Sequence, residues 1–504
     1  MGTLSERNPS LWVGTTDPAP YAPLDGDTSA DVVVIGAGIA GLTTARLLAA
    51  EGRRVAVVDA GSVCAGATGY TTAKVTSLHT LIYAQLEKSF DADTAAIYGA
   101  ANEAAIHRIV ELTANDEIDC ELEQAAAYTY TLQAENLPDI EAEVNAATRA
   151  GLSAAFTTET DLPYDVLGAV RVDGQYQFHP RKYCLGLAQA IVRDGGSVHD
   201  HTRALEVDED THTVTTDRGT ISAGDVVIAS HQPFPLHGGY FARAEPWRSY
   251  VLALSVDGPR PEGMYISCDE QTRSVRSTAA GHVLVGGEGH KVGHDDDTEA
   301  NYARLESWAR ETFPVTSVEY RWSAQDYKTP DGLPYIGRMT PGSDHVYVAT
   351  GFRKWGMTNG TVAAMILADT IAGRENPWSS TFDSHRSSIA QSIKGLISEN
   401  LDVAKRFIGD RIASLHPASI DDLSTGQGAI VDLDGEKVAA FRDDNGTVHA
   451  VSANCTHMGC RVNFNPAERS WDCPCHGSRF GIDGSVLEGP ATKDLAPATP
   501  VRRM

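Results

Sequence analysis

Cysteine and histidine residues near the C-terminal end have the types and spacing of a metal site. The pattern is Cys455-x-His457, then 15 residues, then Cys473-x-x-His476. Two thiolates could hold one iron of a [2Fe–2S] cluster while two imidazoles hold the other. Two Cys and two His also satisfy the tetrahedral preference of zinc, which stays open as the alternative. Because a zinc loop has no use for the two further cysteines in this stretch, the pattern favours iron and sulfide.

A glycine-rich turn near the N-terminal end has the layout of a dinucleotide-binding site. The apolar stretch Asp31 to Ile35 predicts a strand, Gly36-Ala37-Gly38-Ile39-Ala40-Gly41 a tight turn, and Leu42 to Glu51 a helix. Glycines let the main chain approach a pyrophosphate, whose charge is stabilised at the helix N-terminus. A second predicted strand, Val55 to Val58, ends in Asp59, where an acidic side chain would meet ribose hydroxyls. This turn alone does not separate FAD from NAD.

Three further blocks bear on that choice. They are Gly66-Ala67-Thr68-Gly69-Tyr70-Thr71-Thr72-Ala73-Lys74, the predicted strand Asp225 to Ala229, and Thr329-Pro330-Asp331-Gly332-Leu333-Pro334-Tyr335-Ile336-Gly337 with the following stretch Val346 to Gly351 and a helix near Thr361 to Ile371. Over about residues 31 to 375 the chain thereby resembles the D-amino-acid oxidase/glycine oxidase-like superfamily of FAD-dependent amine and amino-acid oxidoreductases.

The resemblance implies FAD as the cofactor. The residues it assigns to FAD are Gly36, Gly38, Ile39, Ala40, Gly41, Asp59, Ala60, Thr71, Thr72, Ala73, Gly351, Gly356, Met357 and Thr358. A helix N-terminus beneath the flavin pyrimidine would stabilise the negative charge that develops there on reduction. The stretch Gly286-Gly287-Glu288-Gly289 neither keeps the fingerprint spacing nor opens a predicted helix, so we expect no separate NAD(P)H domain.

The C-terminal stretch from about Ser419 to Arg503 resembles the Rieske family. The resemblance implies cluster ligation by Cys455, His457, Cys473 and His476. It also implies a disulfide between Cys460 and Cys475, as in respiratory Rieske proteins, with two buried free thiols as the alternative. Ser478 matches the family's serine that bonds a cluster sulfur. Phe480 departs from the family, because respiratory members usually carry a tyrosine donor there.

Several side chains are weaker candidates for catalysis. Lys74 could stabilise reduced flavin, or it could be a surface lysine. Arg276 could bind a substrate carboxylate bidentately, or it could form a structural salt bridge. His79, His290 and His294 could act as bases, although a loop histidine is more often only polar. Cys64 could hold FAD covalently; we favour a packed thiol.

These sites require an α/β Rossmann-type FAD-binding domain, an α+β substrate domain and a C-terminal all-β Rieske domain. The expected divisions are an N-terminal extension, 1–30; FAD-binding parts, 31–80, 181–234 and 326–382; substrate parts, 81–180 and 235–325; a helical linker, 383–415; and the Rieske domain, 416–504.

The composition narrows the partners and the compartment. The chain has 504 residues and a net charge of −26, which disfavours nucleic acid and anionic membranes as partners. No run of 18 apolar residues occurs, and the first 30 residues lack the layout of a secretory signal, so we expect a cytoplasmic protein without membrane insertion.

The sequence thus predicts a dehydrogenase that takes a hydride from the carbon beside the nitrogen of a small amine or amino acid. A two-electron flavin fused to a one-electron cluster predicts that electrons leave through the cluster to an external one-electron acceptor, a protein or a quinone. The alternative is an electron-transfer module that docks a protein partner and turns over no small molecule.

Overall fold

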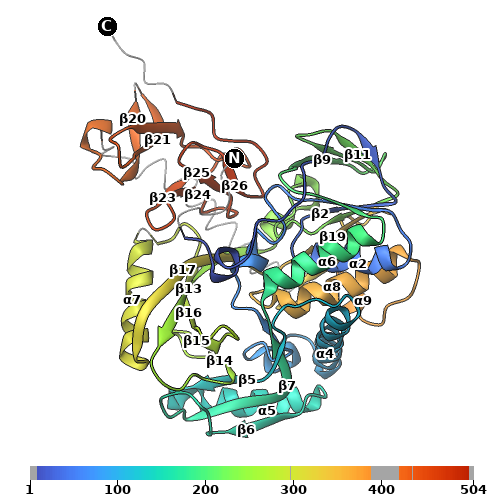
Figure 1. Cartoon of the computed structure of the whole chain (residues 1–504), viewed down its shortest axis with the longest axis vertical. Coiled ribbons are helices and arrows are strands. Elements are labelled where there is room, and N and C mark those ends of the chain that lie inside the picture. The colour runs from blue at the N-terminus through green and yellow to red at the C-terminus, as the bar shows by residue number, and fades with distance from the viewer. Residues whose placement is uncertain (1–7, 296, 387–418, 434, 499–504) are drawn as a thin grey trace.

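The computed structural model describes residues 8–295, 297–386, 419–433 and 435–498. The helical linker predicted for 383–415 therefore lies, from residue 387 on, outside the described residues, as does the boundary near 416. Figure 1 shows the Rieske part beside the strands β13 and β17 of the N-terminal module. No helix within the described ranges is both long and apolar enough to cross a membrane.

The dinucleotide turn belongs to a six-stranded sheet, and its adjacent strands β2 and β3 are buried on both faces. The sheet order is β18 (Tyr335–Arg338), β19 (Val346–Thr350), β12 (Asp225–Ile228), β2 (Val32–Ile35), β3 (Val55–Val58) and β8 (Ser197–His199). All neighbouring pairs are parallel except β18 with β19. Such apolar strands are typical of a parallel sheet covered on both sides.

The two covering layers differ in kind. Val32, Val34, Val55 and Val57 pack in the same apolar core as the helices α2 (Ile39–Ala50), α6 (Pro180–Arg193) and α8 (Gly356–Ile371). The alternate residues of β2 and β3 pack against a four-stranded sheet. That sheet contains β1 (Thr28–Ser29), β11 (Thr220–Ser222), β10 (Thr213–Thr216) and β9 (Ala204–Asp208). The result is the Rossmann-type layering expected from the sequence.

The substrate part is built on a nine-stranded mixed sheet, to which the flavin loop contributes an edge strand. The strands are β17 (Val315–Lys328), β13 (Glu245–Val256), β16 (Val283–Lys291), β15 (Ser274–Ser277), β14 (Met264–Ser267), β5 (Glu123–Thr131), β7 (Gly168–Gln177) and β4 (Lys74–Val75), with β6 (Ala154–Thr157) paired to β7. The helices are α3 (Ile82–Ser89), α4 (Ala92–Asn115), α5 (Leu137–Arg149) and α7 (Thr298–Thr312). The short helices α1 (Leu11–Gly14) and α9 (Ser379–Phe382) lie outside this part.

The Rieske part is all-β within the described residues, apart from one 3-10 turn. One sheet contains β20 (Gly428–Leu433), β21 (Glu436–Arg442) and β22 (Val448–Ser452). The other contains β23 (Asn463–Asn465), β24 (Ser470–Asp472), β25 (Arg479–Gly481) and β26 (Val486–Glu488). The predicted ligands lie on the loops after β22 and between β24 and β25, so two loops of one small domain bring them together.

Candidate active site and cluster site

The glycine turn between β2 and α2 is shaped for close approach of a ligand to the main chain. Gly36 has a φ of +111°, and a Cβ on it would lie 2.5 Å from the carbonyl oxygen of Ala229. A Cβ on Gly41 would lie 2.0 Å from the carbonyl oxygen of Gly36. The first helix residues, Ile39 and Ala40, face a cavity, so the positive end of α2 points into it. This geometry fits a pyrophosphate.

Asp59 stands at the end of β3, as the sequence predicts, and belongs to the wall of the same cavity. Its carboxylate accepts hydrogen bonds from the main-chain N–H groups of Ala37 (2.7 Å) and Gly61 (2.8 Å). Burial raises the pKa of this carboxyl group above its ordinary value. The side chain therefore ties the glycine turn to the strand end at the place where ribose hydroxyls are expected.

The cavity has a volume of about 1030 Å³, at the upper end of the range for cofactor sites. The residues predicted to contact FAD that line it are Gly36, Gly38, Ile39, Ala40, Asp59, Ala60, Thr71, Thr72, Gly356 and Met357. Gly41, Ala73, Gly351 and Thr358 are not among the wall residues. Thr358 instead donates to the carbonyl oxygen of Thr76 at 3.1 Å, so its hydroxyl supports the wall from behind.

The N-terminal extension fixes the flavin loop, a role that sequence reasoning missed. The Ser10 hydroxyl donates to the carbonyl oxygen of Gly69 (2.5 Å), and the Trp12 indole N–H donates to that of Thr71 (2.7 Å). Trp12 is only 1% exposed. A tryptophan in an otherwise polar, Pro-rich stretch was the available signal that this segment packs against the module.

Lys74 and Arg276 lie together, but their surroundings differ. Lys74 lines the cavity and donates to the Ser274 hydroxyl; burial first, and the charge of Arg276 second, lower its pKa to about 7. Arg276 is not a wall residue: it donates to the carbonyl oxygens of Thr72, Ser277 and Phe178. The guanidinium thus braces the flavin loop, whereas the substrate carboxylate suggested by the sequence has no place among these contacts.

The histidine candidates also differ in whether they line the cavity. His79 is buried, bonds Tyr98 Oη (2.5 Å) and the Thr76 carbonyl (2.7 Å), and burial lowers its pKa to about 3. It is absent from the cavity wall, as is His294. His290 does line the cavity, with its Nε2 at 2.9 Å from Tyr250 Oη. Cys64 is a buried thiol outside the wall.

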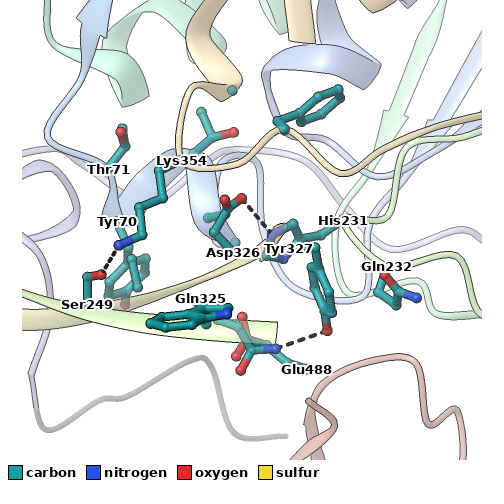
Figure 2. Close-up of a pocket in the computed structure, with 18 of the residues that line it drawn as sticks. Tyr70, Thr71, His231, Gln232, Ser249, Gln325, Asp326, Tyr327, Lys354 and Glu488 are labelled. Carbon is teal, nitrogen blue, oxygen red and sulfur yellow. Dashed lines mark hydrogen bonds and ion pairs between the residues drawn. The ribbon is translucent and has the colours of Figure 1, made fainter. Parts of the chain in front are cut away.

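A second group of wall residues escaped sequence reasoning because each comes from a separate strand or loop. Figure 2 shows Lys354 reaching Ser249, and Asp326 paired with His231. The Lys354 Nζ donates to Ser249 Oγ at 2.6 Å; desolvation by the surrounding protein lowers the pKa of this lysine, and the charge of Asp326 acts in the opposite direction. Arg353 and Lys354 both have positive φ angles, of 51° and 71°. Consecutive non-glycine residues in this conformation are uncommon and concentrate at functional sites.

The predicted cluster ligands converge on one point. The rings of His457 and His476 have centroids 5.1 Å apart. Both ring nitrogens of His457 and Nδ1 of His476 are buried without a hydrogen-bond partner among the described residues. Hydrogen bonding by the Cys473 thiol first, and the Ser478 hydroxyl among weaker donors, lowers the pKa of Cys455 to about 7. Buried, unpartnered imidazoles beside an acidified thiol fit a cluster held by two Cys and two His.

The neighbouring cysteines form the expected disulfide. The Cys460–Cys475 bond joins the two ligand loops, and its sulfurs lie within 4.8 Å of the Cys473 sulfur. The Ser478 hydroxyl accepts a hydrogen bond from the Ala491 N–H at 3.0 Å, which fixes its position. Phe480 is fully buried and offers no donor.

The cluster loops lie directly against the wall of the large cavity. Tyr327 Oη donates to the carbonyl oxygen of His476 (3.2 Å), and Gln325 Nε2 donates to that of Gly477 (2.8 Å). Gln325 and Tyr327 are themselves wall residues of the cavity. The Phe241 ring lies 5.2 Å from the His457 ring and 5.0 Å from the His476 ring. One layer of side chains therefore separates the two candidate cofactor sites.

Comparison with known proteins agrees with both sites. Residues 31–370 match the model of the family described as FAD dependent oxidoreductase. The chain belongs to this family of FAD-dependent oxidoreductases. Residues 415–499 match the Rieske [2Fe-2S] domain. The protein is thus an FAD-dependent oxidoreductase with a Rieske domain, and its cofactors are FAD and a [2Fe–2S] cluster.

Individual relatives match either nearly the whole chain or about 70% of it. The "Putative Rieske 2Fe-2S iron-sulfur protein YhfW" of Bacillus subtilis (strain 168) is 38% identical over 97% of this chain and 97% of its own length. The gamma-glutamylputrescine oxidoreductase of Escherichia coli (strain K12) is 24% identical over 73% of this chain and 90% of its own. Glycine oxidase from Geobacillus kaustophilus shares the fold, with a TM-score of 0.61 at 19% identity over 71% of this chain and 99% of its own.

Proposed function

We propose that this oxidoreductase is a dehydrogenase of a small amine or amino acid, and that its electrons leave through the Rieske cluster to an external one-electron acceptor. Bound FAD takes up two electrons at once, whereas a [2Fe–2S] cluster takes up one. A fused cluster therefore suits an enzyme whose acceptor is a one-electron carrier, a protein or a quinone. The relatives that act on amines, gamma-glutamylputrescine oxidoreductase and glycine oxidase, support the substrate class.

The observation that carries the proposal is the contact between the cavity wall and a cluster ligand. Tyr327 lines the cavity and donates to the main-chain oxygen of His476. It is 1% exposed, so the contact is shielded from water. A fixed, dry contact between the two sites gives electrons a short route that needs no motion of either domain.

Lys354 supports an amino acid rather than a simple amine. Its ammonium lies in the cavity wall and makes its hydrogen bond with a neutral hydroxyl, that of Ser249 (Figure 2). Because an ammonium that faces an open cavity can bind an anionic group of a ligand there, we assign Lys354 as the anchor for a substrate carboxylate. The carboxylate of Asp326 and the imidazole of His231 supply polar groups on the same wall.

The test is anaerobic mixing of the protein with a panel of small amines and amino acids, followed by absorbance and EPR. In wild type we expect flavin bleaching and then the EPR signal of a reduced Rieske cluster. His476→Ala should still bleach but lose turnover with a one-electron acceptor. Equal turnover of both proteins, or a cluster that stays oxidised beside fully reduced flavin, would contradict the electron route. A flavin that no panel member bleaches would favour the docking alternative.

Three variants, one of them a control, sharpen this test without removing a cofactor. Tyr327→Phe should slow reduction of the cluster several-fold and leave bleaching unchanged, while Tyr335→Phe, which removes a buried hydroxyl bonded to Arg243, should change neither rate. Lys354→Met should raise KM about tenfold or more for amino acids and little for amines without a carboxylate. Equal KM changes for both substrate types would remove Lys354 as the carboxylate anchor.

A further inference from the structure

The large cavity has a wall that the FAD module does not supply. Besides the glycine turn and Asp59, it is lined by Leu487, Glu488, Gly489, Ala491 and Thr492, which belong to the Rieske domain. These residues comprise the end of β26 and the segment after it. Figure 2 shows Glu488 beside Gln325 of the FAD module. Most of the chain separates this segment from Gly36, yet both border one space.

Arg203 identifies the part of the cavity that the Rieske segment covers. It is a wall residue next to β9, and its guanidinium donates to the carbonyl oxygen of Val486 at 3.0 Å. Burial lowers its pKa, while the charges of Asp494 and Asp59 act in the opposite direction. The residue before it, Thr202, donates its main-chain N–H to the carbonyl oxygen of Asp59 at 2.7 Å, so Arg203 joins the Rieske segment to the end of β3. Because Asp59 marks the ribose position of the fingerprint, the segment lies over the nucleotide end of the site.

The segment is held in place by a buried seam between the domains. Glu468 accepts hydrogen bonds from the hydroxyls of Tyr302 (3.0 Å) and Ser323 (2.8 Å), and each of these three residues is at most 8% exposed. Nearby, Arg248 of β13 lies 3.6 Å from the Glu488 carboxylate and is 1% exposed. Buried charges and hydroxyls with partners across a seam make separation costly, because each group would lose its partner.

We propose that the Rieske segment 486–492 is a wall of the FAD site, so that FAD enters and leaves only when the Rieske domain moves away from the FAD module. The cluster domain then has a second task, retention of the cofactor. By thermodynamic linkage, docking of the domain strengthens FAD binding, and bound FAD strengthens docking by the same factor. This inference needs no substrate and no electron transfer, so it stands or falls separately from the proposed function.

The first test compares FAD-loaded and deflavinated wild-type protein by hydrogen exchange and mass spectrometry. We expect amide exchange in residues 486–492 to be slower when FAD is bound, although these residues lie outside the FAD family match. Identical exchange in the two forms would overturn the proposal. This arm uses the whole protein and requires no variant to fold.

The second test measures the rate of FAD release by flavin fluorescence after dilution. Glu468→Ala removes both seam hydrogen bonds and touches neither cluster ligand nor the large cavity, so release should be about tenfold faster. Asp444→Ala is the matched control, because Asp444 pairs with Arg469 inside the Rieske domain. It should release FAD at the wild-type rate. Wild-type release from Glu468→Ala, with exchange at 486–492 showing that the segment has opened, would overturn the proposal.

Discussion

The two cofactor sites are built on opposite plans. The predicted cluster ligands span only residues 455 to 476 and lie on two loops joined by a disulfide. The FAD cavity takes its wall from strands, loops and helices between Ile35 and Met357, and from the Rieske segment as well. A site formed by two short loops is encoded in local spacing. A site formed by distant elements depends on the whole fold and can gain new walls from a fused domain.

The largest expected effect is the loss of one cofactor while the other is fully retained. Gly36→Ala places a Cβ about 2.5 Å from the Ala229 carbonyl oxygen at a φ of +111°, so the turn must shift and FAD should be lost. The cluster, built elsewhere, should keep its two irons. Gly342→Ala, in open space, should keep both cofactors. FAD released by denaturation, iron and sulfide are the quantities to measure; full FAD in Gly36→Ala would contradict the assigned role of the turn.

This contrast explains what the sequence could predict. The strand Val55–Val58 was predictable, and the cluster ligands could be proposed, because periodicity and spacing are local properties of the sequence. Lys354, Tyr327 and Glu488 were not, since each becomes a wall residue only after separate strands and domains pack together. The hydrogen bonds of Arg276 were unpredictable for a related reason. Its position on a substrate-domain strand was predictable, but the carbonyl groups that occupy its guanidinium come from other segments.

Removing the disulfide tests how far the stability of the cluster site depends on the covalent link between its two loops. Cys460 and Cys475 are 15 residues apart. In the chain-entropy model, a disulfide that closes a loop of this size stabilises the folded state by about 3 kcal/mol. Replacing both by Ser should lower the unfolding midpoint of the Rieske domain in denaturant by a corresponding amount. Absorbance of the cluster reports the transition. Cys268→Ser, which removes a free thiol in the FAD module, should leave that midpoint unchanged. Equal midpoints for both variants would show that other contacts fasten the loops.

Lys74 tests whether burial of a side chain by distant elements lowers its pKa enough for it to accept a proton in the FAD site. With a pKa of about 7 in the folded protein, Lys74 is an ammonium below that pH and a neutral amine above it. If the amine accepts a proton from the substrate, the rate of flavin bleaching should rise by up to about tenfold per pH unit as the pH increases toward 7. Above pH 7 the rate should become constant. Lys74→Met should remove this inflection. Lys328→Met, at a wall lysine with a pKa of about 8, should retain it. An inflection that persists in Lys74→Met would assign the proton to another group.

The smallest expected effect concerns the hydrogen-bond donors around the cluster. Because this site is formed by two short loops, the contributions of single donors to the reduction potential should be additive. A hydrogen bond to a cluster sulfur stabilises the added negative charge of the reduced state. Losing one donor costs about 1 kcal/mol, which corresponds to roughly 40 mV for a one-electron couple. Ser478→Ala should therefore lower the reduction potential by that order, and Phe480→Tyr should raise it if the new hydroxyl reaches a sulfur. The wild-type centre, with Phe480 in place of a donor, should lie below respiratory Rieske centres. EPR-monitored redox titration measures all three proteins. A wild-type potential near the top of the Rieske range, about +300 mV, would mean that donor count does not set the potential here.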